Sequence, residues 1–232
     1  MRWVLLGCIP FLLWSRQVTA QQLPMHQWLN TGTKEERVQR IISLGVKPES
    51  AKLAVADEVQ WRAMRGRFRS ETAILFIPCF LNTASMSVLE NTGQHWHASD
   101  TVSLDCHYDD SLSFEVASLR VPRVDDVLIH HDCKGHGTGI LQQNFEVFAI
   151  VSSKFKAVLS TEEILKVSGW PGAREIDQQS SFVVSTTRSD GSKVIEETRR
   201  KLDNGSLTVE RRGFHWSLAE FRFLPTEFVT VQ

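Results

Sequence analysis

The stretch HHDCKGHGTG, from His130 to Gly139, concentrates side chains that can bind metal. Imidazole nitrogen and thiolate sulfur are ligands that zinc accepts in proteins. Cys133 and His136 have the spacing of one half of a zinc motif, and no matching second half is found. Six of the eight histidines lie between Cys79 and His136. The candidate metal site, with zinc as the implied ion, consists of His107, His130, His131 and His136.

The cysteines offer a different interpretation of the same region. Alternation along extended segments puts Leu104 and Cys106 on one strand face, and it puts Ile129, His131 and Cys133 on another. If the two strands are neighbours, a Cys106–Cys133 disulfide can join them. A bridge of this span typically stabilises a secreted protein by about 3 kcal/mol. We favour this bridge over a cysteine-ligated metal, and we expect Cys79 to be a buried thiol.

A short segment of the same stretch, Gly135 to Thr138, resembles the histidine motif of subtilisin-like serine proteases. A catalytic triad also needs a nucleophile and an orienting acid. In that family a Gly-Thr-Ser-Met type of motif follows the histidine, and nothing after His136 resembles it. The protease interpretation is therefore rejected.

The first residues, MRWVLLGCIPFLLWSRQVTA, have the pattern of a secretory signal peptide. A positive charge at Arg2 precedes a short apolar run, and small residues follow before Ala20. The run is too short to span a bilayer, which takes about 20 apolar residues. We expect residues 1–20 to be removed after Ala20, which predicts a secreted or periplasmic protein.

Composition excludes some partners. The formal net charge of −1 offers no strong positive field for nucleic acid. No second long apolar run follows the signal-like segment, so no transmembrane segment is expected in the mature chain. The expected partner is an unknown extracytoplasmic ligand or protein.

Residues 21–70 are predicted to be helical. Thr33 and Glu36 form a capping box that predicts a helix as far as Leu44, and Gly45 stands where a helix ends. Pro48 predicts a second helix from Glu49 to about Arg67. Four arginines gather at the end of this second helix, where a solvated face explains them: Arg62, Arg65, Arg67 and Arg69.

Residues 71–170 are predicted to form a β-rich domain, because short apolar segments alternate there with turn residues. Thr161 to Glu163 is expected to open a helical turn near its end. Residues 171–232 are predicted to form an antiparallel meander, which either stands alone or packs with the preceding region. Asp190-Gly191 and Asn204-Gly205 are typical hairpin turns within it. Its strands are expected near 181–188, 193–202, 206–215 and 219–224, and the charged run IEETRRK predicts one solvated face.

The predicted fold is α+β, an N-terminal helical hairpin followed by a mainly antiparallel β region. Two classes of function follow. The first is a non-catalytic binding or interaction module outside the cytoplasm, favoured because no complete catalytic motif is found. The alternative is a metal-dependent hydrolase that uses the candidate zinc site around His107, His130, His131 and His136.

Overall fold

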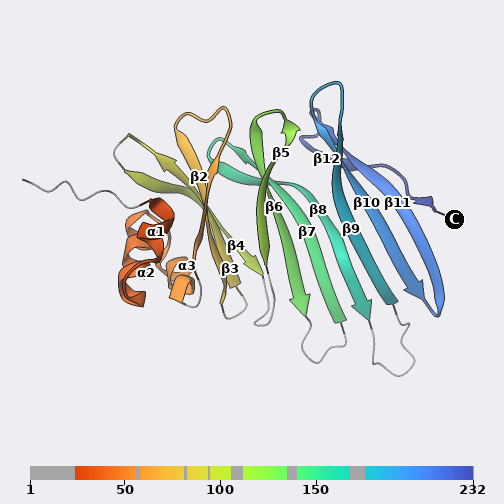
Figure 1. Cartoon of the computed structure of the whole chain (residues 1–232), viewed down its shortest axis with the longest axis horizontal. Coiled ribbons are helices and arrows are strands. Elements are labelled where there is room, and N and C mark those ends of the chain that lie inside the picture. The colour runs from red at the N-terminus through yellow and green to blue at the C-terminus, as the bar shows by residue number, and fades with distance from the viewer. Residues whose placement is uncertain are drawn as a thin grey trace, which may run out of the picture.

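The computed structural model describes residues 24–55, 58–80, 83–93, 95–105, 112–134, 140–167 and 176–231. Antiparallel strands dominate these residues, and three short α-helices precede them (Figure 1). The β-rich prediction is thus confirmed. The α+β label and the helical hairpin are not, because the helices are short and cover only one end of the strand assembly. The predicted signal peptide, residues 1–20, lies outside the described residues.

The helical part matches the sequence prediction only in its first half. Its elements are α1 (Met25–Asn30), α2 (Lys34–Ser43), α3 (Pro48–Lys52) and the 3₁₀ turn η1 (Leu53–Val55). The capping box of α2 is confirmed, since Thr33 accepts from the Glu36 amide at 3.2 Å and Glu36 accepts from the Thr33 amide at 2.9 Å. Gly45 follows α2 with a φ of +84°, a left-handed conformation that glycine adopts without strain.

The predicted second helix, from Glu49 to about Arg67, is wrong beyond Lys52. Strand β1 (Gln60–Met64) occupies much of its second half and pairs with β2 (Glu71–Phe80). Trp61 packs toward the helices and Met64 toward the space between the two sheets. Residues 60–64 form a strand because they pair with β2, although the local sequence pattern favours a helix and contains no strong strand signal.

The strands belong to two sheets. Sheet A has the order β1-β2-β3-β4, and sheet B has the order β12-β11-β10-β9-β8-β7-β6-β5 with β13 paired to β11. The further strands of sheet A are β3 (Thr83–Asn91) and β4 (Trp96–Asp105). Sheet B is built from β5 (Ser113–Val121), β6 (Val124–Lys134), β7 (Ile140–Val151), β8 (Lys154–Val167), β9 (Ile176–Thr187), β10 (Lys193–Asp203), β11 (Ser206–Ser217), β12 (Arg222–Pro225) and β13 (Val229–Thr230).

The C-terminal meander is confirmed, with β9 to β12 close to their predicted ranges. Asn204 and Gly205 both have positive φ, as their hairpin requires. The helical turn predicted from Thr161 is wrong, because β8 runs through it and pairs with β7 over most of its length. Since β8 also pairs with β9, sheet B continues across residue 170.

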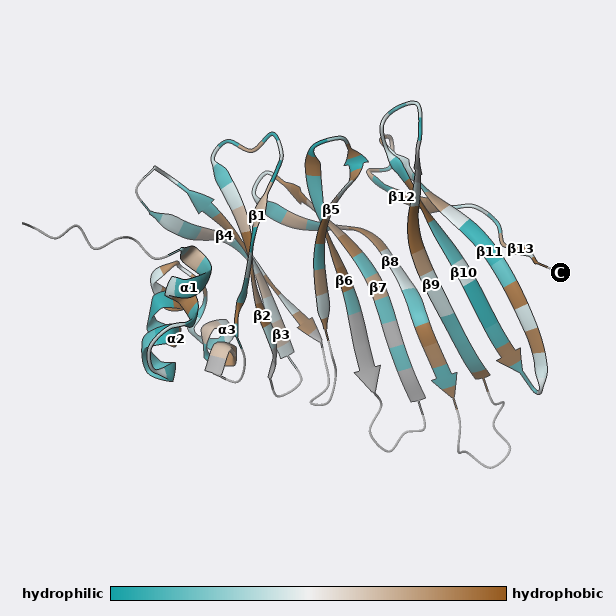
Figure 2. Cartoon of the chain, viewed as in Figure 1, coloured by the Kyte–Doolittle hydropathy of each residue, from teal (hydrophilic) through white to brown (hydrophobic). Residues whose placement is uncertain are grey.

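Three apolar clusters hold these layers together, and the brown segments of the strands in Figure 2 follow them. One lies between the helices and sheet A, around Ile41 and Leu75. A second lies between the two sheets and joins Phe76 to Ile129. The third lies on the opposite face of sheet B, around Phe145, Ile195 and Phe214. We call this last surface the inner face of sheet B.

Sheet B folds over its own inner face at the end that is uppermost in Figure 1. Strands β8 and β9 pair only over Ile164–Val167 and Ile176–Gln179, at the opposite end. Above that point the two halves of the sheet pack on each other. The Phe145 and Phe182 rings stack at 4.5 Å, and the Arg120 guanidinium lies 5.2 Å from the Trp216 ring.

Candidate functional site

The structure brings only part of the predicted metal site into view. His107 and His136 lie outside the described residues, and the side chain of His131 is not described either. His130, on β6, pairs with Glu163 on β8 rather than with another predicted ligand. Within the described part of the chain, no three His, Cys, Asp or Glu side chains are grouped so that they could hold a metal ion.

The Cys106–Cys133 bridge stays a prediction, because Cys106 and the side chain of Cys133 are outside the described part of the chain. The premise that their strands are neighbours is wrong. Strand β4 belongs to sheet A and β6 to sheet B. The apolar rows that precede the two cysteines, represented by Leu104 and Ile129, nevertheless pack in the same cluster between the sheets.

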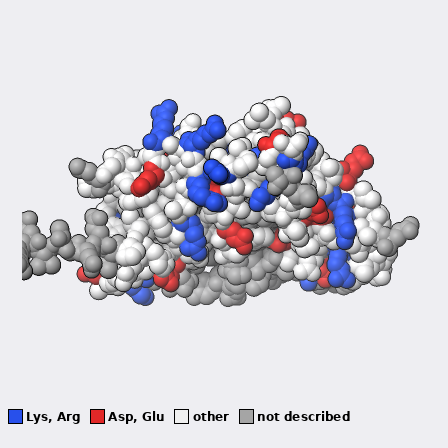
Figure 3. Space-filling view, turned by 45° about the horizontal axis from the view of Figure 1, so that its top comes forward, with Lys and Arg blue, Asp and Glu red and all other residues white. Residues whose placement is uncertain are grey.

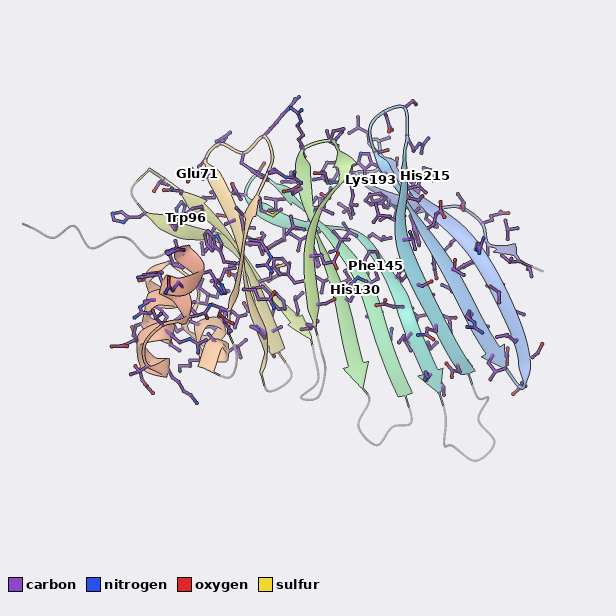
Figure 4. The ribbon with its side chains drawn as sticks, in the orientation of Figure 1. Glu71, Trp96, His130, Phe145, Lys193 and His215 are labelled. Carbon is purple, nitrogen blue, oxygen red and sulfur yellow. The ribbon has the colours of Figure 1, made fainter. Side chains whose placement is uncertain are left out.

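His130 takes part in a polar pair on the inner face of sheet B. Its Nδ1 lies 3.0 Å from Oε2 of Glu163, and its ring lies 4.9 Å from the ring of Phe145 on the neighbouring strand (Figure 4). The hydrogen bond with Glu163 raises the pKa of His130 above its ordinary value of 6.5; burial opposes this shift, and the charges of Glu163 and Glu115 add to it. The pair is therefore an ionic contact that strengthens when the imidazole is protonated.

A second polar group on the inner face is centred on Glu197 of β10. Its side chain is fully buried, and its two oxygens accept hydrogen bonds from three side chains. Ser180 donates at 2.6 Å, Arg199 donates through Nε at 3.1 Å, and Arg212 donates through Nε at 2.6 Å. One carboxylate thus serves two guanidinium groups, and Glu210, which is opposite Arg199 in the β10–β11 register, adds a half-buried acid on the same face.

Arg212 connects the Glu197 group to a pocket. Its Nη2 donates to Thr161 Oγ1 at 3.1 Å, and its guanidinium lies over the rings of Phe214 and Phe228, at 4.6 and 4.3 Å. Four contacts therefore fix the orientation of this side chain, and it remains 16% exposed. A guanidinium held in this way presents a preorganised positive charge to whatever occupies the pocket.

The pocket lies between β8 and the β11–β12 hairpin and has a volume of about 570 Å³. This size falls within the range of about 300–1,000 Å³ typical of small-molecule sites. Its polar groups are Arg212, Arg222, Ser160 and Thr161. Its apolar lining consists of Ala157, Val158, Leu159, Phe214, Phe223, Leu224 and Pro225.

One wall of the pocket is a strand edge. The β8–β9 register covers only Ile164–Val167 of β8, so the segment 157–161 has no strand partner on that side among the described residues. A strand edge presents backbone N–H and C=O groups. This wall can therefore hydrogen-bond to a ligand, and the apolar side chains around it provide contact area.

Sequence reasoning missed the Glu197 group because it lies within the charged run IEETRRK. The predicted solvated face exists, since Glu196 and Arg200 are exposed. The other face of the same strand carries Ile195 and Glu197, both fully buried. The apolar Ile195 was the available signal, because alternate residues of a strand share a face and Glu197 therefore lies on the buried side with it.

No family model matches this chain, and neither the curated proteins nor the solved structures contain a match to it. Over the described residues, none of the helices is long and apolar enough to cross a membrane.

Proposed function

We propose that this protein is a non-catalytic binding protein that acts outside the cytoplasm and takes a small amphiphilic anion in the pocket between β8 and β12. The observation that carries the proposal is the pairing of a largely apolar lining with the fixed guanidinium of Arg212. The signal-like N-terminus supports a secreted or periplasmic location.

The ligand class follows from the chemistry of the lining. Apolar side chains favour a hydrocarbon portion, whose burial contributes about 25 cal/mol per Å². Arg212 and Arg222 favour a carboxylate or phosphate head, which guanidinium groups bind in a two-point geometry. Arg222 is 61% exposed and pairs with Glu220 at 2.6 Å, so it can exchange one carboxylate for another at the mouth.

Dodecanoate is a suitable probe, and calorimetric titration of the mature chain measures its binding. Dodecanol and dodecyltrimethylammonium test the charge requirement with the same hydrocarbon chain. We expect dodecanoate to bind at least about tenfold more tightly than either, which corresponds to roughly 1.4 kcal/mol. Equal affinity for all three probes would show that Arg212 plays no part in recognition.

Matched variants test the location of the site. Ala157→Trp places a large ring at the pocket lining and should abolish dodecanoate binding, whereas Ala63→Trp puts the same ring at an exposed position of β1 in sheet A. Loss of binding in both variants, or in neither, contradicts the assignment. Elemental analysis of the same samples tests the alternative: stoichiometric zinc that is lost on His130 or His136 substitution favours the metal-dependent hydrolase.

A further inference from the structure

The arginines that the sequence placed at a helix end lie instead at the upper end of the two sheets. Arg65, Arg67 and Arg69 belong to the loop between β1 and β2, and all three are exposed. This loop contacts the start of β6, because the Arg65 carbonyl accepts from the Asp125 amide at 2.8 Å. Arg123, in the turn just before β6, is exposed as well.

A third turn joins this surface. Arg120, near the end of β5, lies under the turn between β11 and β12, with its guanidinium 5.4 Å from the Phe221 ring. The next residue, Val121, is 45% exposed, and Leu218 in the facing turn is 79% exposed. Two exposed aliphatic side chains thus lie within three residues of the contact between Arg120 and Phe221: Val121 at the end of β5, and Leu218 in the β11–β12 turn.

This surface carries both basic and acidic side chains. Arg65 pairs with the buried Asp125, whereas Arg67, Arg69 and Arg123 have no ion-pair partner among the described residues. Two acids lie close by: Glu71 follows Arg69 at the start of β2, and Asp190 lies in the β9–β10 turn, whose Gly191 packs against Pro122. In Figure 3, Lys and Arg side chains are spread over the face that is turned forward, with Asp and Glu side chains between them.

We propose that this end of the protein docks onto an anionic phospholipid bilayer through Arg67, Arg69 and Arg123, with Val121 and Leu218 inserted at the headgroup boundary. Exposed apolar side chains beside unpaired cations are the combination that peripheral membrane surfaces use. Docking of this kind needs no ligand in the pocket, only a membrane surface that the protein can reach.

Vesicle sedimentation tests the docking. The mature chain is mixed with vesicles of phosphatidylcholine alone or of phosphatidylcholine and phosphatidylglycerol in equal parts. Each cation near an anionic surface changes binding about fivefold, so Arg67→Glu/Arg69→Glu/Arg123→Glu should weaken sedimentation with the anionic vesicles at least about 100-fold. Added salt should weaken binding of the unmodified chain, because it screens this attraction.

The charge-matched control is Lys166→Glu/Arg200→Glu/Arg211→Glu, which changes three exposed cations on the strands of sheet B. This control should bind anionic vesicles like the unmodified chain. Urea unfolding of both triple variants establishes that each is folded, and the single variant Arg123→Glu gives the same test if the triple variant fails to fold. Equal loss in both triple variants means that only net charge matters, and it overturns the proposal.

A second readout reports insertion. The tryptophan fluorescence of Leu218→Trp should shift to the blue when anionic vesicles are added. That of Leu207→Trp, at a 55% exposed site of the β10–β11 hairpin, should not shift. Binding to soluble heparin without sedimentation on vesicles would assign the surface to polyanions and overturn the membrane proposal. Ala157→Trp, which blocks the pocket, should still sediment with anionic vesicles. Membrane docking can therefore be tested even if the proposed pocket binds no ligand.

Discussion

Removing the charge of Glu197 should destabilise the fold by about 3 kcal/mol. In Glu197→Gln, shape is kept, but the two guanidinium groups of Arg199 and Arg212 lose their shared counter-charge, and an amide N–H then faces one of them. Breaking a buried ion pair from one side costs about 3–5 kcal/mol. Because Arg199 and Arg212 keep 17% and 16% exposure and can reach water, the lower end of that range applies.

Urea unfolding followed by circular dichroism measures this change. The midpoint should fall while the m-value stays constant, since the surface exposed on unfolding does not change. In thermal unfolding, 3 kcal/mol corresponds to a drop of about 6–12 °C for a chain of this size.

The matched control is Glu196→Gln, one residue away on the exposed face of the same strand, where the carboxylate accepts from Ser185 at 2.6 Å. A surface change of this kind should stay within about 0.5 kcal/mol. If both substitutions lower the free energy of unfolding equally, or if Glu197→Gln lowers it by less than about 1 kcal/mol, Glu197 is not the buried counter-charge of Arg199 and Arg212.

Four further outcomes follow from the same contacts. Glu197→Gln should bind dodecanoate severalfold more tightly in the calorimetric titration, because no carboxylate then competes for Arg212. The His130–Glu163 contribution to stability should be fully present below pH 6.5 and lost as the pH rises through the elevated folded-state pKa of His130. Urea midpoints measured across this pH range test it. If a Glu163→Gln variant shows the same pH profile, the pair does not make this contribution. Phe145→Ala should lower the unfolding free energy by about 3–5 kcal/mol, because the ring is 1% exposed and stacks on Phe182; a loss under about 1 kcal/mol would contradict that packing. Thr33→Ala should lower the free energy of unfolding by about 1 kcal/mol, because it removes the N-cap of α2. An unchanged urea midpoint would show that α2 does not need this N-cap.

The parts of the fold that the sequence predicted are those coded by local chemistry. The capping box of Thr33 and Glu36 and the turn at Asn204-Gly205 act within a few residues, so neither depends on what packs against it. The second helix failed for the opposite reason. Whether Gln60–Met64 is helix or strand is decided by β2, a partner that single-sequence patterns do not place.

The candidate site was less predictable because its members come from distant strands. His130 was singled out for metal binding, but its partner Glu163 lay in a segment expected to be a helical turn. Arg212 meets Thr161 only because sheet B folds over itself where β8 and β9 separate. No spacing in the sequence encodes a contact that depends on how two halves of one sheet come together.

The same fold explains why Glu197 and the pocket belong together. An arginine that faces a partly apolar cavity alone is poorly solvated, and a single buried carboxylate offsets that cost. Because this carboxylate is shared with Arg199, only one of its oxygens contacts Arg212, whose remaining N–H groups can reach a ligand in the pocket. Glu197 therefore stabilises the fold but competes with an anionic ligand for Arg212. A change that strengthens the Glu197–Arg212 contact should weaken the binding of an anionic head in the pocket.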